Sequence, residues 1–506
     1  MNKTQDHLQD VKSSFWDYFS LIFSKGGVLL FGVLVVGLIT RLLGPENYGK
    51  FSLFFMVSQF LMFGLISWTS ASVIRFGKEE FIKEGRVNKV FWARTLILAV
   101  CFIFGISLVL IFRQQIANYI GFPSWIIWFI IAHFFIYSLS EFLFYVFQAI
   151  GRLKTLALTE FSEALSLFII LLFVRFFFRL SPFLFAAILV SYFVAKILID
   201  LFFLFQLDLK IFFPIEIDKT VLKRILLFSW PLIFGVAAGY IINWADIFFV
   251  KKYLTIADVG YYSLALKFIT TLNYTSLVLN VVFLPMLVSF LASNRKDLIV
   301  RYVKRIIPQI SFLWLIGSFL VFTFSPFLIP LIFGVQFKVS ILPVSILLIG
   351  YAITVFSVLY SPVLVAFELI KRGVVVNVSM AIFNLLLVIF FIPRFGMAGA
   401  AVSKSLAYAL GGLCYFFLTN HYLKLKEYKQ ILLIIPPVIF FIVVLLLPGI
   451  YFFLISALLL FITMLLIAKK INLFSPEDKI IFEKIDMPEF VKKWIYKIID
   501  KLSPAL

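Results

Sequence analysis

The chain has 506 residues, of which 63% are hydrophobic and 14% are charged, and its net charge is +20. Because about a quarter of the residues of a soluble globular domain are charged, this composition excludes a soluble domain and indicates a polytopic membrane protein. The two cysteines, Cys101 and Cys414, each lie in an apolar segment, which excludes a disulfide framework and a metal site built on a cysteine pair.

Fourteen apolar segments are long enough to span a bilayer as helices, since a span needs about 20 residues. We therefore predict an all-α polytopic membrane protein with about fourteen transmembrane helices. They are centred near Val28, Leu61, Ile103, Phe135, Leu167, Val190, Ala238, Leu277, Phe319, Ile353, Leu387, Leu410, Phe440 and Leu458. The N-terminus is polar, and the first apolar segment is longer than the core of a signal peptide, so we expect the N-terminus to be retained.

The distribution of lysine and arginine predicts the topology, because these residues accumulate in the cytoplasmic loops of membrane proteins. With the N-terminus placed in the cytoplasm, 32 of them fall in cytoplasmic segments, 9 in the opposite loops and 4 within spans. This asymmetry predicts a multi-pass protein with both termini in the cytoplasm. It also accounts for the positive net charge without a nucleic-acid partner.

After the first predicted span, the segment RLLGPENYGKFSL at residues 41–53 has the spacing G-x-x-x-x-G-K of a phosphate-binding loop. Such a loop follows a buried strand and ends in a Ser or Thr that binds magnesium. Here the last position is Phe51, and the segment before the motif is long enough for a transmembrane helix. The motif therefore does not indicate an ATPase, and we expect no nucleotide or other cofactor.

The same segment is repeated later in the chain. LGPENYGKFSL at 43–53 aligns with LTIADVGYYSL at 254–264, and Gly49 corresponds to Gly260 at a constant offset of 211. Each copy joins the first two spans of a six-helix set, which predicts two parallel repeats related by an axis along the membrane normal. The glycine allows a tight joint between helices, and Asn47 and Asp258 are suited to cap the helix that follows.

The repeat also divides the chain into predicted domains. We expect a six-helix lobe at residues 1–210, a second six-helix lobe at 211–423 and two further helices at 424–468. The segment 469–506 has periodic apolar residues among lysines, which is typical of an amphipathic tail on the anionic inner leaflet of the membrane.

Four segments together carry a resemblance to a known family: SKGGVLLFGVLVVGLITRLLGPENYGKFSLF, DIFFVKKYLTIADVGYYSLALKF, PLIFGVQFKVSILPVSILLIG and FIPRFGMAGAAVSKSLAYALGG. In their order and spacing they resemble the polysaccharide biosynthesis proteins, the O-antigen and capsule repeat-unit flippases of the multidrug/oligosaccharidyl-lipid/polysaccharide exporter superfamily. The resemblance implies two lobes around a central cavity in the cytoplasmic (inner) membrane.

The resemblance also implies a function, which is transport rather than enzymatic catalysis. A flippase of this family moves undecaprenyl-diphosphate-linked oligosaccharide from the inner to the outer leaflet by alternating access, for the synthesis of lipopolysaccharide or capsule. The implied partners are this lipid-linked substrate and the membrane lipids, with a polymerase and a chain-length protein as further candidates.

Ionisable side chains within apolar spans are costly unless they face a polar cavity or a partner, so each is a candidate for function. A diphosphate headgroup requires cations, whereas Lys196 has Asp200 four residues later and is expected to pair with it. Arg75, at the inner end of the second span, is placed to receive the diphosphate. As one of the basic residues of a cytoplasmic loop, it is equally explained by a role in membrane topology. The candidates for substrate binding are Lys25, Lys267, Lys404, Arg75 and Asn243.

Asp246 and Glu141 are the candidates for coupling transport to a proton or a sodium ion. Asp246 shares a helix face with Asn243, but pairing with Lys267 or Lys251 would also explain an acidic residue there. Neither a second His nor a Cys accompanies His133 at metal-ligand spacing, so we predict no metal site and no catalytic residues.

Three other functions remain open. One is a passive scaffold for polymer export, for which buried charge without transport would be an unexplained cost. A multidrug cation exporter of the same superfamily would be expected to have an acidic cavity in place of a lysine-bearing one. A membrane-embedded glycosyltransferase or polymerase would need acids or many arginines on a large outer loop, and the predicted outer loops are short and poor in acids.

Overall fold

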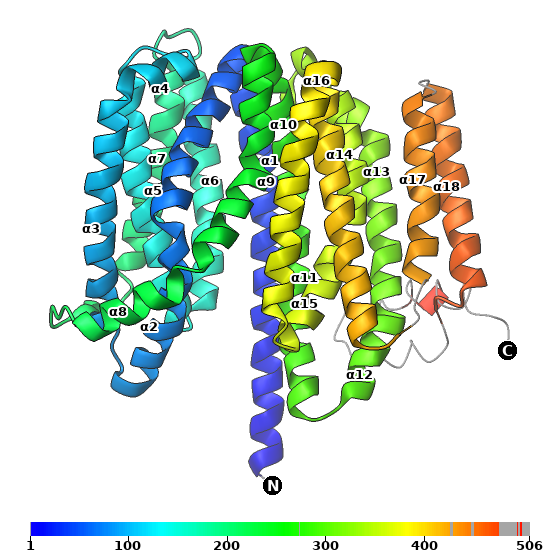
Figure 1. Ribbon diagram of the computed structural model, residues 1–506, viewed down its shortest axis with the longest axis horizontal. Coiled ribbons are helices and arrows are strands. Elements are labelled where there is room, and N and C mark those ends of the chain that lie inside the picture. The colour runs from blue at the N-terminus through cyan, green and yellow to red at the C-terminus, as the bar shows by residue number, and fades with distance from the viewer. Residues whose placement is uncertain are drawn as a thin grey trace. The chain divides into compact units, whose positions relative to one another are not determined.

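The computed structural model describes residues 2–272, 274–425, 429–446 and 450–474, with 493, 496 and 497, and it describes side chains from Gly26 onward with short gaps. These residues form α-helices and a few short 3-10 or π segments, and no strand occurs among them (Figure 1). Within the same residues, nine helical segments are long and apolar enough to cross a membrane. The predicted all-α, multi-pass fold is confirmed, while the count of fourteen spans stays a prediction.

The helices pack into two compact units, of which the first comprises Met1–Tyr274 and Pro330–Ser340. Its helices are α1 (Asn2–Leu65), η1 (Ser67–Thr69), α2 (Ser70–Glu84), α3 (Asn88–Ile111), α4 (Arg113–Ile120), α5 (Ile126–Ala149), α6 (Leu153–Phe178), α7 (Leu184–Leu204), η2 (Leu209–Phe212), α8 (Lys219–Ser229), α9 (Leu232–Tyr253), α10 (Ile256–Leu272) and η4 (Val335–Ser340). Helices α3, α5, α6 and α7 run side by side, and α8 lies across the lower ends of α2 and α3 (Figure 1).

The second unit comprises Thr275–Ile329 and Ile341–Leu506. Its helices are α11 (Tyr274–Ala292), α12 (Lys296–Arg301), η3 (Tyr302–Ile306), α13 (Ile307–Phe333), α14 (Ile341–Ile353), α15 (Val355–Ala366), α16 (Ile370–Tyr422), α17 (Lys429–Leu446) and α18 (Ile450–Lys470). Helix α16 packs along both α14 and α15, and α17 packs against α18. The lobe boundaries at 210 and 423 stay a prediction, and most of the predicted tail lies outside the described residues.

Two long helices each contain a break between two predicted spans. In α1, Gly44 has φ 71° and ψ 174°, a backbone conformation that glycine adopts at little cost. Pro45 follows, and proline suits the first turn of a helix because no backbone donor is needed there. In α16, Gly396 has φ 57° and ψ −138° and follows Pro393. These breaks lie where the sequence predicts the joints between the first two spans and between the eleventh and twelfth spans.

The segment with the spacing of a phosphate-binding loop is helical on both sides of Gly44. The Nζ atom of Lys50 lies 3.0 Å from Oε1 of Glu46, one helical turn earlier, and 5.4 Å from the centroid of the Phe122 ring. Lys50 thus has local partners at the start of a helix, in agreement with the prediction that this segment joins two helices.

The two copies of the repeat contact each other through their glycines. A β-carbon on Gly49 would overlap the carbonyl oxygen of Ile256, and one on Gly260 would overlap the carbonyl oxygen of Pro45. Because only glycine has no β-carbon, these positions allow α1 and α10 to touch backbone to backbone. The equivalent residues of the repeat therefore meet at one helix crossing within the first unit.

The start of α10 is held by a capping box. The backbone N–H and the hydroxyl of Thr255 donate to the carboxylate of Asp258 at 3.0 Å and 2.7 Å, and the Asp258 N–H donates to the Thr255 hydroxyl at 3.2 Å. The capping role predicted for Asp258 is confirmed, whereas that of Asn47 stays a prediction.

Candidate functional site

Two adjoining cavities lie within the first unit. One has a volume of about 410 Å³ and is lined by α1, α5, α6, α7 and α10, and the other, of about 590 Å³, is also lined by α9. They share the lining residues Val36, Tyr137, Glu163, Tyr192 and Lys267. Because α1, α5, α6, α7 and α9 are long and apolar enough to cross a membrane, these cavities lie among membrane-spanning helices.

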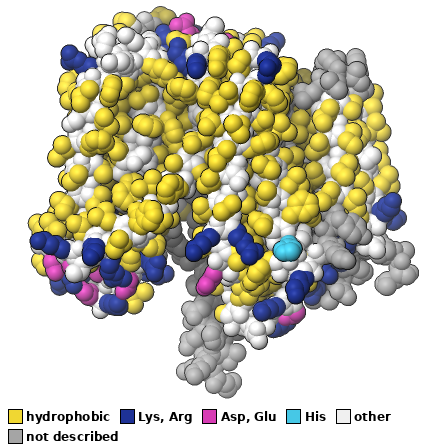
Figure 2. Space-filling model, viewed as in Figure 1, with side chains coloured by type: hydrophobic (Ala, Val, Ile, Leu, Met, Phe, Trp, Pro, Cys, Tyr) yellow, Lys and Arg dark blue, Asp and Glu magenta, His cyan; other side chains and the backbone are white. Residues whose placement is uncertain are grey.

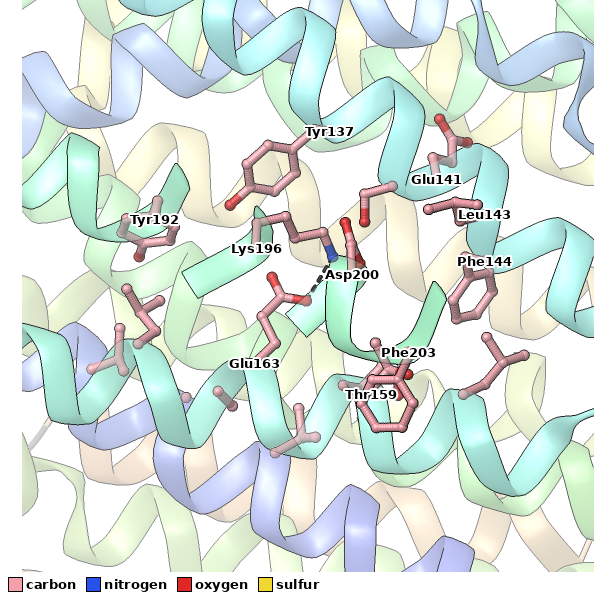
Figure 3. Close-up of a pocket in the computed structure, with 18 of the residues that line it drawn as sticks. Tyr137, Glu141, Leu143, Phe144, Thr159, Glu163, Tyr192, Lys196, Asp200 and Phe203 are labelled. Atoms are coloured by element: carbon pink, nitrogen blue, oxygen red, sulfur yellow. Dashed lines mark hydrogen bonds and ion pairs between the residues drawn. The ribbon is translucent and has the colours of Figure 1, made fainter. Parts of the chain in front are cut away.

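Three helices present polar side chains to the smaller cavity at intervals of four residues (Figure 3). Residues four apart share one face of a helix, so each of the three helices turns a polar stripe toward the cavity. We call this set the α5–α7 wall; its members are Tyr137, Glu141, Thr159, Glu163, Tyr192, Lys196 and Asp200. This wall was not predicted from the sequence, although the repeated spacing of four is visible there.

An ion pair between helices lies at the centre of the α5–α7 wall. The Nζ atom of Lys196 on α7 lies 2.6 Å from Oε2 of Glu163 on α6, and the two side chains are only 16% and 23% exposed (Figure 3). The expectation that Lys196 pairs with Asp200 is therefore corrected. A lysine four residues before an acid is the less favourable order on one helix, and Asp200 accepts a hydrogen bond from Ser140 while remaining in electrostatic reach of Lys196.

Glu141 belongs to a second buried network beside the cavity. Its carboxylate accepts hydrogen bonds from the hydroxyls of Ser67 and Ser70, each at 3.2 Å, and interacts electrostatically with Arg94. The Arg94 side chain is 1% exposed and donates to the carbonyl oxygen of Ile66 at 3.0 Å, where the helical path is interrupted before η1. Arg94 is thus a buried partner of Glu141 on α3.

Lys267 lies on α10 and lines both cavities. Within the described part of the chain, its ammonium group forms no ion pair and no hydrogen bond. Its surroundings in the larger cavity include Asn243 and Trp244 of α9, and the Asn243 amide donates to the carbonyl oxygen of Gly239 at 2.8 Å. Of the residues predicted for substrate binding, the structure brings Lys267 and Asn243 together.

The other predicted residues lie elsewhere. Asp246 on α9 is fully buried, and its carboxylate accepts a hydrogen bond of 2.5 Å from the Tyr262 hydroxyl. It does not line either cavity. Lys404 lies on α16 in the second unit and is 2% exposed. Arg75 is exposed on α2, outside both cavities, and the side chain of Lys25 on α1 lies outside the described residues.

The arrangement can bind charged groups of either sign. The smaller cavity has acidic side chains on α5, α6 and α7, whereas the α10 side contributes an ammonium group. No group of three or more His, Cys, Asp or Glu that could hold a metal ion occurs in the part of the chain that the structure describes.

The sequence profile of the family described as "Polysaccharide biosynthesis protein" matches residues 16–291, more than half of the chain. A protein of Haloferax volcanii described as "Probable low-salt glycan biosynthesis flippase" is 25% identical over 198 residues. This alignment covers 38% of the present chain and 41% of that protein, so it spans less than half of the relative's length.

Solved structures with the same fold are transporters. A lipid II flippase in an inward closed conformation has a TM-score of 0.62 at 17% identity, with 90% of this chain and 98% of that chain covered. A MATE transporter of Vibrio cholerae has a TM-score of 0.60 at 13% identity, with 82% and 97% covered. A MOP superfamily transporter of Pyrococcus furiosus has a TM-score of 0.56 at 14% identity, with 81% and 96% covered. At these identities the similarity shows the fold alone.

Proposed function

Because the chain belongs to the polysaccharide biosynthesis protein family, we propose that it translocates a lipid-linked oligosaccharide across the cytoplasmic membrane by alternating access. The proposed carrier lipid is undecaprenyl diphosphate, and the proposed pathway is the synthesis of a surface polysaccharide such as an O-antigen or a capsule. The chain is a multi-pass membrane protein of transporter fold, and its relatives are transporters rather than enzymes.

The observation that carries the proposal is the ammonium group of Lys267 in the cavities. A charge among membrane-spanning helices is costly unless a partner or water compensates it. Lys267 forms no ion pair among the described residues, so an anionic group of the cargo is a suitable partner. A diphosphate fits this role because it has several oxygen acceptors and more than one negative charge, and Lys267 is exposed where it lines the cavities.

The larger cavity supplies groups that suit a sugar chain. Gln59 and Asn243 offer amides for hydrogen bonds to hydroxyl groups, and Tyr48 and Trp244 offer aromatic faces. Thr270 lies one turn of α10 from Lys267, so a hydroxyl accompanies the ammonium group at the cavity surface. The proposed cargo would therefore place its diphosphate near Lys267 and its sugars toward α9.

Several residue roles and the topology belong to the same proposal. We assign Lys25 and Lys404 to further cationic positions and Glu141 and Asp246 to ion coupling. Both termini would lie in the cytoplasm, as the lysine and arginine distribution predicts. Reporter fusions after Ser289 or at Leu506 test this topology, and an external signal from either fusion would contradict it.

A second candidate function is export of organic cations. Four carboxylates line the smaller cavity, on Glu141, Glu160, Glu163 and Asp200, and they outnumber its lysines. An acidic cavity suits a cationic drug, and MATE transporters share the fold. The ion pair to Lys196 and the network around Glu141 reduce the number of carboxylates left to bind a cation, so we rank this function second.

Deletion of the gene in its own host separates the two functions. If the protein is a flippase, cells without it lose surface polysaccharide and accumulate lipid-linked oligosaccharide, and expression from a plasmid restores both to normal. Sensitivity to organic cations such as ethidium stays unchanged. Normal polysaccharide together with raised ethidium sensitivity would contradict the proposal and favour the cation exporter.

A further inference from the structure

Two arginines lie outside the cavities, where α2 and α8 pack together. The hydrophobic core at this contact contains Phe76, Val90, Ala93, Ile97 and Ile225, with Val221, Leu222 and Phe228 packed against it. The inward residues of α8 recur at intervals of three and four, so α8 is an amphipathic helix with its apolar face on α2 and α3.

The start of α8 is well defined. The Asp218 carboxylate accepts hydrogen bonds from the backbone N–H of Thr220 at 2.7 Å and of Val221 at 3.3 Å, as a helix N-cap. The Thr220 hydroxyl also donates a hydrogen bond to this carboxylate, which is the main cause that lowers the pKa of Asp218 from its ordinary value. The Asp218 carboxylate is therefore ionised at neutral pH. The helix is therefore a stable platform for the side chains on its outer face.

Two arginines flank the aromatic pair at this contact. The guanidinium carbon of Arg75 lies 4.8 Å from the ring centroid of Phe228 and 5.6 Å from that of Phe76. The guanidinium carbon of Arg224 lies 4.6 Å from the Phe76 centroid. The two rings are 5.4 Å apart at 70°, so both cations rest on one aromatic cluster. We call Arg75 and Arg224 the arginine pair.

The members of the arginine pair differ in their partners. The Nη2 atom of Arg224 lies 3.1 Å from Oε2 of Glu79, whose carboxylate also pairs with Lys83 at 2.9 Å. Hydrogen bonds from Lys83 and then from Arg224 lower the pKa of Glu79, so this carboxylate is ionised at neutral pH and fixes Arg224. Arg75 forms no ion pair with any of the described residues, and the residue is exposed. The Glu79 carboxylate pairs with Arg224 and Lys83 and not with Arg75. The arginine pair therefore keeps positive charge and N–H donors available for an anion.

The surroundings of the arginine pair match the level of lipid headgroups. Uncharged residues precede Arg75 on α2, and most of the charged residues of the helix follow it. Beyond Arg224, the side chains of Leu226, Leu227 and Trp230 are exposed, and Trp230 is 56% exposed. Figure 2 shows Lys and Arg side chains along the lower edge of the part that carries α2, α3 and α8, below a broad hydrophobic surface.

We propose that the arginine pair binds the phosphate of an anionic membrane phospholipid, with the acyl chains lying along the exposed apolar side chains that follow Arg224. Arginine suits this role because its planar group donates two parallel hydrogen bonds to phosphate oxygens. Neither arginine lines the cavities, so the phosphate belongs to a lipid of the surrounding membrane rather than to a cargo within the cavity. The bound lipid would hold α8, which connects α7 to α9, at the membrane surface.

Native mass spectrometry of the purified full-length protein tests this site with phosphatidylglycerol and phosphatidylcholine as the probes. We expect saturable binding of phosphatidylglycerol and little retention of phosphatidylcholine. Each lost arginine should weaken phosphatidylglycerol binding by more than about fivefold, since a basic residue near an anionic lipid surface contributes about 1 kcal/mol and the hydrogen bonds from arginine to the phosphate add to it. The variant Arg75→Gln/Arg224→Gln should therefore lose more than the single variant Arg75→Gln, which leaves the Arg224–Glu79 pair intact.

The matched control is Lys78→Gln/Lys223→Gln, which removes the same charge from the same two helices without touching the aromatic cluster. We expect this control to weaken phosphatidylglycerol binding less than the double arginine variant does, because the two lysines contribute only to the surface potential, whereas each arginine also donates hydrogen bonds to the phosphate. Equal losses in the control and in the arginine variant would overturn the site, as would unchanged binding by Arg75→Gln. Displacement of phosphatidylglycerol by equimolar undecaprenyl diphosphate would assign the site to the cargo and overturn the proposal. None of these outcomes depends on whether the protein is a flippase.

Discussion

Two lysines that line one cavity differ in how their charge is compensated. Lys196 on the α5–α7 wall lies 2.6 Å from a carboxylate of the neighbouring helix, and Asp200 adds a second acid nearby. Lys267 on α10 lines the same cavity, and the described residues provide it with no ion-pair partner. A lysine in an apolar span is therefore not by itself evidence of a binding site. The informative property is the absence of a local counter-ion.

This contrast separates two kinds of contribution to the protein. The paired lysine joins α6 to α7, so its loss should act first on packing and stability. The lysine without an ion-pair partner should act first on the cargo, because its own helices do not depend on a bond to its ammonium group. Substitutions at the two positions should therefore give different measurable profiles.

The largest effect is expected for Lys267→Ala. A hydrogen bond to a charged group contributes about 1.5–3 kcal/mol, so losing one to the cargo diphosphate should lower the export rate by about tenfold or more. Lys267→Arg should retain part of the activity, because the charge is kept while the geometry changes. The measurement is surface polysaccharide in a complemented deletion strain, with the amount of protein in the membrane checked.

The stability of the variant provides the control for this prediction. Thermal unfolding of purified Lys267→Ala in detergent should match that of the wild type, since no described ion pair is broken. A folded Lys267→Ala protein that exports polysaccharide at the wild-type rate would remove Lys267 from the cargo site.

The second largest effect is expected for Glu163→Gln. This change leaves the Lys196 ammonium without its closest counter-ion in a part of the protein that is mostly shielded from water, so unfolding should occur at a lower temperature. The double variant Glu163→Gln/Lys196→Gln should recover part of the loss, because neighbouring residues of one pair couple by about 0.5–3 kcal/mol. The single variant Lys196→Gln completes the comparison. If the decreases in stability of Glu163→Gln and Lys196→Gln simply add in the double variant, the ion pair does not stabilise the α5–α7 wall.

Most of the fold follows from the sequence, because hydropathy and helix breaks are local properties. The apolar segments predict the helices, and the repeat predicts a joint between the first two spans. The break in α1 is at Gly44, whereas Gly49, the glycine expected to form this joint, lies within the helix and contacts α10. The positions of Lys267 and Glu141 at a cavity follow from the cost of a charge in an apolar span. These features need no knowledge of which helices are neighbours.

The partners of the charged residues could not be predicted in the same way. Lys196 has an acid at a suitable distance on its own helix, yet it pairs with Glu163, which only the packing of α6 against α7 brings close. Arg94 lies near the start of an apolar helix and resembles a loop cation in the sequence, but packing against α2 and α5 buries it. Contacts between helices decide both cases, and a single sequence does not record them.

A smaller effect is expected for Gly260→Ala, which tests how α10 holds Lys267 in place. The added methyl group would overlap the carbonyl oxygen of Pro45, so α10 must move away from α1, with a cost of about 1–3 kcal/mol. Gly64→Ala on α1 is the matched control, because no atom lies within 4 Å of a β-carbon there. The unfolding temperature should be lower than that of the wild type for Gly260→Ala, and equal to it or higher for Gly64→Ala. Equal behaviour of the two variants would contradict the backbone contact between α1 and α10.

The smallest effect is expected for Lys50→Ala. Lys50 adds a third lysine to the comparison of Lys196 with Lys267. Its ammonium group is paired with Glu46 within one helix, and the Glu46 side chain is 65% exposed. Such an exposed pair contributes only about 0.3–0.5 kcal/mol, so export and unfolding temperature should stay close to the wild type. Loss of export at normal protein level would contradict this, and would reopen the phosphate-binding interpretation of the segment 41–53.

Translocation in proteoliposomes tests the central claim most directly, namely that Lys267 serves an anionic lipid-linked cargo. The protein is reconstituted with an undecaprenyl-diphosphate-linked oligosaccharide, and the fraction that becomes accessible to an added glycosidase is followed over time, with and without excess ethidium. The account predicts that wild type accelerates translocation, that Lys267→Ala slows it by about tenfold or more, and that ethidium does not compete. Ethidium uptake by the wild type, with no translocation of the lipid-linked oligosaccharide, would contradict the account.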